Sequence, residues 1–252
     1  MSSNKKKRIV IIGATSAIAE HCARLWVKAS PVDLVLVGRD LPKIEVVAAD
    51  LRVRSPNTNV RCVQANFVDP AAIRELANVI VRSGALDIVL IAHGSLPDQG
   101  QCQDDLSHAQ DALTINGVSP VLFAEAFVQH MEVAGAGTLA IIGSVAGDRG
   151  RKSNYVYGAA KGMVARYVQG LQHRLAHTGV KVVLIKPGPT DTPMTAHLKQ
   201  QGAHLASVDS VARAIVLGLE GGKPVIYVPA KWALIMMVIR HLPGFIFNRL
   251  NI

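Results

Sequence analysis

Residues 8–19, Arg8-Ile9-Val10-Ile11-Ile12-Gly13-Ala14-Thr15-Ser16-Ala17-Ile18-Ala19, carry a short apolar run through a glycine turn into a helical pattern. The run is rich in β-branched residues, as is typical of a buried strand. Because the first N–H groups of a helix carry the positive end of its dipole, this strand–turn–helix unit commonly holds a dinucleotide pyrophosphate. Ala17 and Ala19 stand where a glycine-rich fingerprint has glycines. A generic strand-to-helix turn of an α/β domain is the alternative interpretation.

The alternation of strand and helix patterns continues along most of the chain. Strands are expected near 8–13, 33–38, 59–65, 86–92, 137–143, 180–186 and 224–228, and helices near 16–29, 41–54, 70–83, 105–131, 154–177 and 207–219. This order predicts an α/β, doubly wound Rossmann fold with a mostly or fully parallel seven-stranded sheet. Right-handed crossovers bring all strand carboxyl ends to one edge, where such sheets bind ligands. We expect one nucleotide-binding domain over 1–230 and an apolar tail over 231–252.

A tyrosine, a lysine and a serine near the middle of the chain suggest proton-transfer chemistry. Tyr157 and Lys161 lie four residues apart in a predicted helix, and Ser144 follows the apolar run that ends thirteen residues before the tyrosine. A spacing of four places phenol and ammonium on one helix face. We therefore expect the ammonium to lower the pKa of Tyr157 from about 10 toward neutrality, so that the phenol can exchange a proton with a substrate oxygen. Taken alone, the motif is more often a surface pair.

Together these motifs resemble the short-chain dehydrogenase/reductase family, in family order and at family spacings from residue 8 to about 230. The motifs that carry the resemblance are Gly13-x-x-x-Ala17-x-Ala19, Thr114-Ile115-Asn116-Gly117, Ser144, Tyr157 with Lys161, and Pro187-Gly188-Pro189-Thr190-Asp191-Thr192. The resemblance implies that Tyr157 is the general acid, that Lys161 binds the nicotinamide ribose, and that Ser144 orients the carbonyl. It also implies that Asn116 anchors a chain of water molecules that returns the proton through Lys161.

Two positions depart from the family pattern. Ile91-Ala92-His93-Gly94 replaces Asn-Asn-Ala-Gly after the fourth strand, and Asn66 replaces the aspartate expected near the adenine. A histidine at such a position is more often structural than a proton carrier, so we assign His93 no catalytic role.

The end of the second strand, Leu36-Val37-Gly38-Arg39, bears on the choice of cofactor. An acidic residue there would bind the 2′-hydroxyl of NAD, whereas Gly38 leaves room and Arg39 offers a charged fork to a 2′-phosphate. We expect NADP(H), with NAD(H) as the less favoured cofactor; a solvated loop cation is the other interpretation of Arg39. The expected cofactor-binding residues are Gly13, Thr15, Ser16, Ala17, Ile18, Arg39, Asn66, Phe67, Ala92, Gly94, Tyr157, Lys161, Pro187, Gly188, Thr190 and Thr192.

The composition excludes several classes of protein. The chain has 252 residues, three scattered cysteines without metal-ligand spacing, and a formal net charge of +9. We expect no metal site and free thiols in a reducing compartment. Aromatic residues make up only 4% of the chain and are not interleaved with basic ones, which argues against nucleic acid as a partner. We see no signal peptide and expect a cytoplasmic protein, on which an anionic cofactor and an anionic membrane surface account for the charge.

Two segments suggest a narrower resemblance. Residues 93–99 and 144–151 look like the branch that contains the decaprenylphosphoryl-2-keto-pentose reductases, which implies a keto sugar carried on a polyprenyl phosphate. The apolar run at 232–239 is too short to span a bilayer. The tail could lie in the inner membrane interface, form a wall of an apolar substrate pocket, or contact a second subunit of a homodimer or homotetramer.

The function expected from the sequence is therefore NAD(P)H-dependent reduction of a ketone to a secondary alcohol. The substrate would be a small-molecule or lipid-linked carbonyl compound. A reductase of 3-oxoacyl chains and a catalytically silent NADP-binding scaffold are the alternatives, because substrate loops vary freely on this fold.

Overall fold

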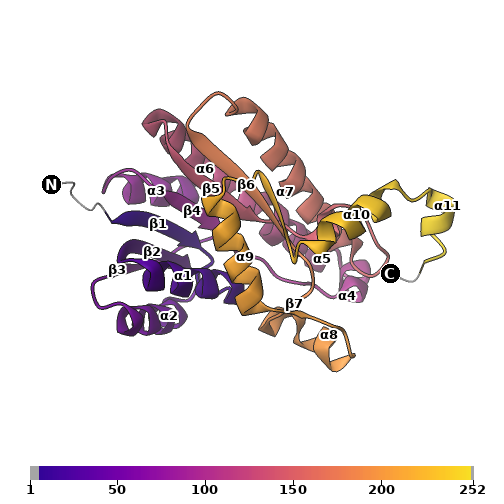
Figure 1. Cartoon of the computed structure of the whole chain (residues 1–252). Coiled ribbons are helices and arrows are strands. Elements are labelled where there is room, and N and C mark those ends of the chain that lie inside the picture. Colours follow the sequence, from indigo (N-terminus) through magenta and orange to yellow (C-terminus); the bar gives the residue numbers. More distant parts are fainter. Residues whose placement is uncertain (1–5, 251–252) are drawn as a thin grey trace.

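A fully parallel seven-stranded sheet forms the centre of the molecule, in the order β3-β2-β1-β4-β5-β6-β9 (Figure 1). The computed structural model describes residues 6–250. The strands are β1 (Lys7–Ile12), β2 (Val32–Gly38), β3 (Asn59–Gln64), β4 (Ile88–Ile91), β5 (Gly137–Ile142), β6 (Val180–Pro187) and β9 (Val225–Val228). This confirms the predicted doubly wound fold. Strand order reverses between β1 and β4, which is where such folds bind their ligands.

Helices cover both faces of the sheet and enclose two hydrophobic cores. One face carries α1 (Ala17–Ala29), α2 (Leu41–Arg54) and α9 (Val208–Glu220); the other carries α3 (Pro70–Val81), α6 (Ser119–Ala134) and α7 (Tyr155–Arg174). The inner strands β1, β2 and β6 are nearly continuous apolar runs rich in β-branched residues because both of their faces are buried.

The predicted helix over 105–131 is interrupted in the structure. It consists of α5 (Leu106–Leu113), a π-helical turn η1 (Thr114–Val118) and α6, and it is preceded by a separate short helix, α4 (Gln99–Asp104). The Asn116 side chain donates to the carbonyl of Ala112 at 2.9 Å, four residues earlier, where a backbone N–H would bind in a regular helix. The π turn therefore lies at a predicted site residue, as such turns often do.

The run Leu106–Ala134 is the one helical stretch among residues 6–250 that is long and apolar enough to cross a bilayer. Phe123 and Phe127 on this stretch are fully buried against the sheet. It is a core helix of the domain.

Two short strands that the sequence did not predict follow the sixth strand. β7 (Thr190–Asp191) pairs with β8 (Ala206–Ser207), and between them lie η3 (Pro193–Thr195) and the small helix α8 (Ala196–Gln200). The pairing brings both ends of this excursion together at the carboxyl edge of the sheet (Figure 1).

The C-terminal tail forms α10 (Lys231–His241) and α11 (Gly244–Phe247), at the end of the molecule opposite β3 (Figure 1). Met236 is fully buried, and Trp232 lies directly against Gly188, where an added Cβ would be 2.0 Å from its indole nitrogen. The Arg149 guanidinium donates to the carbonyl oxygens of Ile239 (2.5 Å) and Leu242 (2.6 Å). The tail is therefore attached to the domain along one side.

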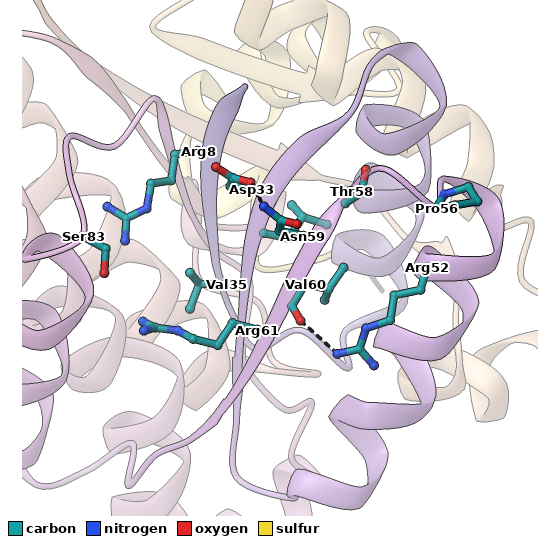
Figure 2. Close-up of a pocket in the computed structure, with 11 residues that line it drawn as sticks. Arg8, Asp33, Val35, Arg52, Pro56, Thr58, Asn59, Val60, Arg61 and Ser83 are labelled. Carbon is teal, nitrogen blue, oxygen red and sulfur yellow. Dashed lines mark hydrogen bonds between the residues drawn. The ribbon is translucent and has the colours of Figure 1, made fainter. Parts of the chain in front are cut away.

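An open hollow of about 730 Å³ lies at the amino ends of β1, β2 and β3, on the edge opposite the predicted site (Figure 2). Asn59 donates to Asp33 at 2.7 Å, and Arg52 donates to the carbonyl of Val60 at 2.9 Å. These contacts stabilise the edge strand β3, and the hollow brings together none of the predicted catalytic residues.

Candidate active site

A cavity of about 340 Å³ opens at the carboxyl edge of the sheet. The predicted residues that line it are Gly13, Thr15, Ser16, Ala17, Ile18, Arg39, Phe67, Ala92, Gly94, Asn116, Ser144, Tyr157, Lys161, Pro187, Gly188, Thr190 and Thr192. Asn66 does not line the cavity. Its side chain is exposed and accepts a hydrogen bond from the N–H of Val68 at 3.0 Å, so it shapes the turn after β3.

The turn after β1 has the features of a phosphate-binding loop. Gly13 has a φ of +86°, and an added Cβ would lie 2.6 Å from the backbone nitrogen of His93, so only glycine fits here. Ser16 begins α1 without a side-chain cap, whereas Asp40 and Asp69 cap α2 and α3. The first N–H groups of α1 are therefore left without a side-chain acceptor at a cavity wall, which fits an anionic phosphate.

The residues after β2 suit a 2′-phosphate. Gly38 and Arg39 line the cavity, and Gln64 donates to the carbonyl of Arg39 at 2.9 Å, which fixes its backbone. Asp40 turns the other way: it accepts from the N–H of Lys43 at 3.1 Å, and this bond lowers the pKa of its carboxyl group. Among residues 6–250, no acidic side chain lines the cavity.

Ser144 and Tyr157 come together because a glycine lets two segments touch. Ser144 follows β5 and accepts from the N–H of Ala146 at 3.1 Å, which begins the short turn η2 (Val145–Gly147). A Cβ added at Gly147 would lie 2.6 Å from the backbone carbonyl carbon of Lys161, so the turn packs directly on α7. Ser144, Tyr157 and Lys161 therefore line one wall of the cavity.

The pKa of Tyr157 is raised from its ordinary value, which reverses the direction expected from the sequence. Burial is the largest cause, while the nearby Ser144 hydroxyl and the Arg151 guanidinium act in the opposite direction. The Lys161 ammonium lies 5.8 Å from the centre of the Tyr157 ring and donates to the carbonyl of Ile142 at 3.1 Å. Helical spacing correctly put lysine and tyrosine on one face, but the expected charge effect of the lysine was wrong.

Lys161 is itself nearly fully buried, with 3% of its surface exposed. Burial lowers the pKa of its ammonium group to about 8, because removing water penalises the charged form. At neutral pH it still carries its proton.

Asn116 is fully buried and uses both ends of its amide. Its Oδ1 accepts from the N–H of Ser95 at 2.9 Å, while its Nδ2 holds the carbonyl of Ala112. Gly94 is required beside it, because an added Cβ would lie 2.8 Å from the Asn116 oxygen. The amide thus ties the loop after β4 to the π turn of the long helix.

His93 serves as a packing residue in place of the small alanine of the family pattern. Its Nε2 lies 2.8 Å from the Ser119 hydroxyl, and its ring makes an edge contact with Phe67 at 4.7 Å between ring centres. Burial, together with the charges of Lys161 and Arg39, lowers the pKa of His93 to about 3. It is neutral at physiological pH, as a structural histidine would be.

Two further polar residues line the cavity near Tyr157: Arg151 and Asn154. Their position in the sequence could have indicated this, because the loop that joins Ser144 to Tyr157 begins and ends at the predicted catalytic residues. Among residues 6–250 no group of His, Cys, Asp and Glu could hold a metal ion.

Comparisons with known proteins agree with this geometry. A family model described as short chain dehydrogenase matches residues 7–203. An uncharacterized oxidoreductase of Streptomyces coelicolor is 30% identical over 256 residues, covering 99% of this chain and 98% of its own; one of Mycobacterium tuberculosis is 31% identical over 245 residues, 96% of each. A short-chain dehydrogenase from Sphingobium yanoikuyae, solved with NADPH, has a TM-score of 0.80 at 25% identity, covering 94% of this chain and 97% of that one.

Proposed function

The chain belongs to the short-chain dehydrogenase family of oxidoreductases, and on that premise we propose that it is an NADPH-dependent reductase of ketones. The observation that carries the proposal is a single cavity that combines an uncapped helix start, a cation after β2, and the set Asn116, Ser144, Tyr157 and Lys161. A complete set of this kind favours an enzyme over a silent nucleotide-binding scaffold.

NADPH, when bound, supplies the hydride that reduces the carbonyl carbon. In the proposed reaction Tyr157 donates its phenolic proton to the carbonyl oxygen, and Ser144 donates a hydrogen bond to the same oxygen. The raised pKa of Tyr157 keeps the phenol protonated at neutral pH, which suits a general acid.

The expected cofactor is held by three parts of the cavity. The N–H groups at the start of α1 would bind the pyrophosphate, Arg39 the 2′-phosphate, and Lys161 the nicotinamide ribose. The NADPH complex of the Sphingobium protein supports NADP(H) over NAD(H), as does the absence of an acidic residue from the cavity lining.

We further propose that the ketone is carried on a lipid, such as a keto sugar on a polyprenyl phosphate, and that the tail contacts the membrane. Leu234 is 63% exposed and Phe245 is 70% exposed, so the tail presents large apolar side chains that contact with a membrane would cover. The tail has no acidic residue and carries Lys231, Arg240 and Arg249, which suits an anionic lipid surface. Arg149, from the loop that follows Ser144, holds the end of α10, so the tail lies beside the active site.

The reductase proposal is tested with Tyr157→Phe, which removes only the phenolic proton. We expect NADPH affinity to change less than about twofold, and single-turnover hydride transfer to a ketone that the parent reduces to fall by roughly 10²- to 10⁴-fold. Tyr155→Phe is the matched control, since that exposed hydroxyl only receives a hydrogen bond from Gln103 at 3.0 Å. Hydride transfer by Tyr157→Phe within tenfold of the parent would refute the role given to Tyr157.

A further inference from the structure

Arg151 is a half-buried cation for which residues 6–250 provide no counter-charge. Its guanidinium makes no hydrogen bond and no ion pair within this part of the chain, and its Nε is buried without a partner. Burial lowers its pKa, which reflects the cost of holding the charge away from water. An arginine in this condition is unusual, because buried charges are normally paired.

The neighbouring charged groups of the same loop are already engaged. Asp148 is the one acidic residue between Ser144 and Tyr157, and it forms a buried pair with Lys186 while accepting from the Tyr227 hydroxyl at 2.8 Å. Arg149 points to the end of α10, where it donates to the carbonyl oxygens of Ile239, Arg240 and Leu242. Arg151 therefore faces the cavity without a partner from its own segment.

In the described part of the chain, the arginine and lysine side chains that line the cavity are Arg39, Lys161 and Arg151, and no acidic side chain lines it. Arg39 follows β2 and Arg151 follows β5, and these strands are three positions apart in the sheet. At about 4.8 Å per strand the carboxyl ends of β2 and β5 are separated by roughly 14 Å, so the loop that carries Arg151 begins well away from the site expected for the 2′-phosphate. It lies instead near Tyr157, at the end where the carbonyl would react.

We propose that Arg151 binds an oxyanion, a phosphate ester or a carboxylate, on the ketone substrate, and so selects anionic ketones over neutral ones. Asn154 lines the cavity in the same loop, and its buried side-chain oxygen has no partner, so it can accept a hydrogen bond from a substrate hydroxyl group beside the oxyanion. This rests on the proposed reductase function and adds to it the charge of the substrate. A guanidinium fork suits both phosphate and carboxylate because it can donate two parallel hydrogen bonds.

The test compares ketones that differ only in charge: 4-oxocyclohexyl phosphate, 4-oxocyclohexanecarboxylate and the neutral 4-hydroxycyclohexanone. We expect Arg151→Gln to lower kcat/KM for one or both anionic ketones about 10- to 100-fold, with the neutral ketone changed less than about threefold. The anion that loses more identifies the natural group. Arg151→Lys should recover part of the loss, and Lys152→Gln, at the adjacent exposed position, should change nothing. Equal losses on charged and neutral ketones would overturn the proposal.

A binding measurement separates this inference from the reductase proposal. Calorimetry of the same compounds with the NADP⁺ complexes of the parent and Arg151→Gln needs no turnover. Anion binding that is lost in Arg151→Gln supports the oxyanion site even if no ketone is reduced, in which case the reductase proposal fails alone. Anion binding that is absent from the parent, or equal in both proteins, overturns the oxyanion site whatever the activity shows.

Discussion

Replacing Arg39 with alanine should weaken NADPH binding and leave NADH binding nearly unchanged. The side chain is exposed at the cavity mouth and has no ion pair within residues 6–250, so its removal should cost the fold little. A charge-assisted hydrogen bond to phosphate contributes about 1.5–3 kcal/mol, which corresponds to roughly 10- to 150-fold in Kd. Because Arg39 is solvent-exposed, we expect the lower end of that range, about tenfold.

Calorimetric titrations of both cofactors at two salt concentrations measure this effect directly. The matched control is Lys43→Ala, which removes an exposed cation that pairs with Asp40 at 3.1 Å outside the cavity lining. Higher salt should reduce the difference in NADPH affinity between the parent and Arg39→Ala, because salt screens an ionic contact. An equal loss of affinity for NADPH and NADH in Arg39→Ala would refute the argument for the 2′-phosphate.

Three further predictions concern a lysine, a buried pair and the tail. Since the pKa of Lys161 is lowered to about 8, its ammonium is present below that pH and lost above it, so NADPH affinity should weaken as pH rises through about 8. In fluorescence titrations, Lys161→Met should bind NADPH more weakly than the parent does and should lack this pH dependence. The same dependence of NADPH affinity on pH in both proteins would contradict the ribose contact. Asp148→Asn leaves the charge of Lys186 buried without its partner, so it should lower the free energy of unfolding in urea by about 3–5 kcal/mol. Adding Lys186→Met to this variant should recover part of the lost stability. A loss below about 1 kcal/mol would show that the pair is dispensable. Leu234→Asp should reduce cosedimentation with phosphatidylglycerol vesicles roughly tenfold. The control Val133→Asp, at a 91% exposed site on α6, should leave cosedimentation unchanged. A parent protein that never binds these vesicles would refute the membrane proposal.

The sheet and the positions of the site were predictable because both follow from local signals. Most strands of the sheet are short apolar runs rich in β-branched residues, and strand and helix patterns alternate along the chain, which indicates a parallel order. Ser144 and Gly13 come directly after two such runs, so their place at one edge followed without knowledge of side-chain packing. Helical spacing then put Tyr157 and Lys161 on the same wall.

The properties that failed to follow from the sequence depend on packing between distant segments. Tyr157 has a raised pKa because burial outweighs every charge around it, and burial is not visible in a spacing of four residues. The π turn at Asn116 shifts the helix by one residue, which a search for helical periodicity does not resolve. Asn66 lies outside the cavity because its side chain completes its own turn with Val68. The burial of Met236 in the tail likewise depends on contacts with distant segments.

The basic side chains of the cavity fall into two groups: the sheet and its helices position one group, and a loop positions the other. Arg39 lies directly after strand β2 and Lys161 lies on the core helix α7, so the sheet and its packed helix set their positions in the cavity. Arg151 stands in the loop between Ser144 and Tyr157, and Arg149 in the same loop holds the tail. Since loops vary while the sheet is preserved, changes in this one segment would alter the charge of the preferred substrate and the attachment of the tail together. The proposed oxyanion site and the proposed membrane contact would thus both depend on a single loop, and Arg151→Gln and Leu234→Asp test them separately.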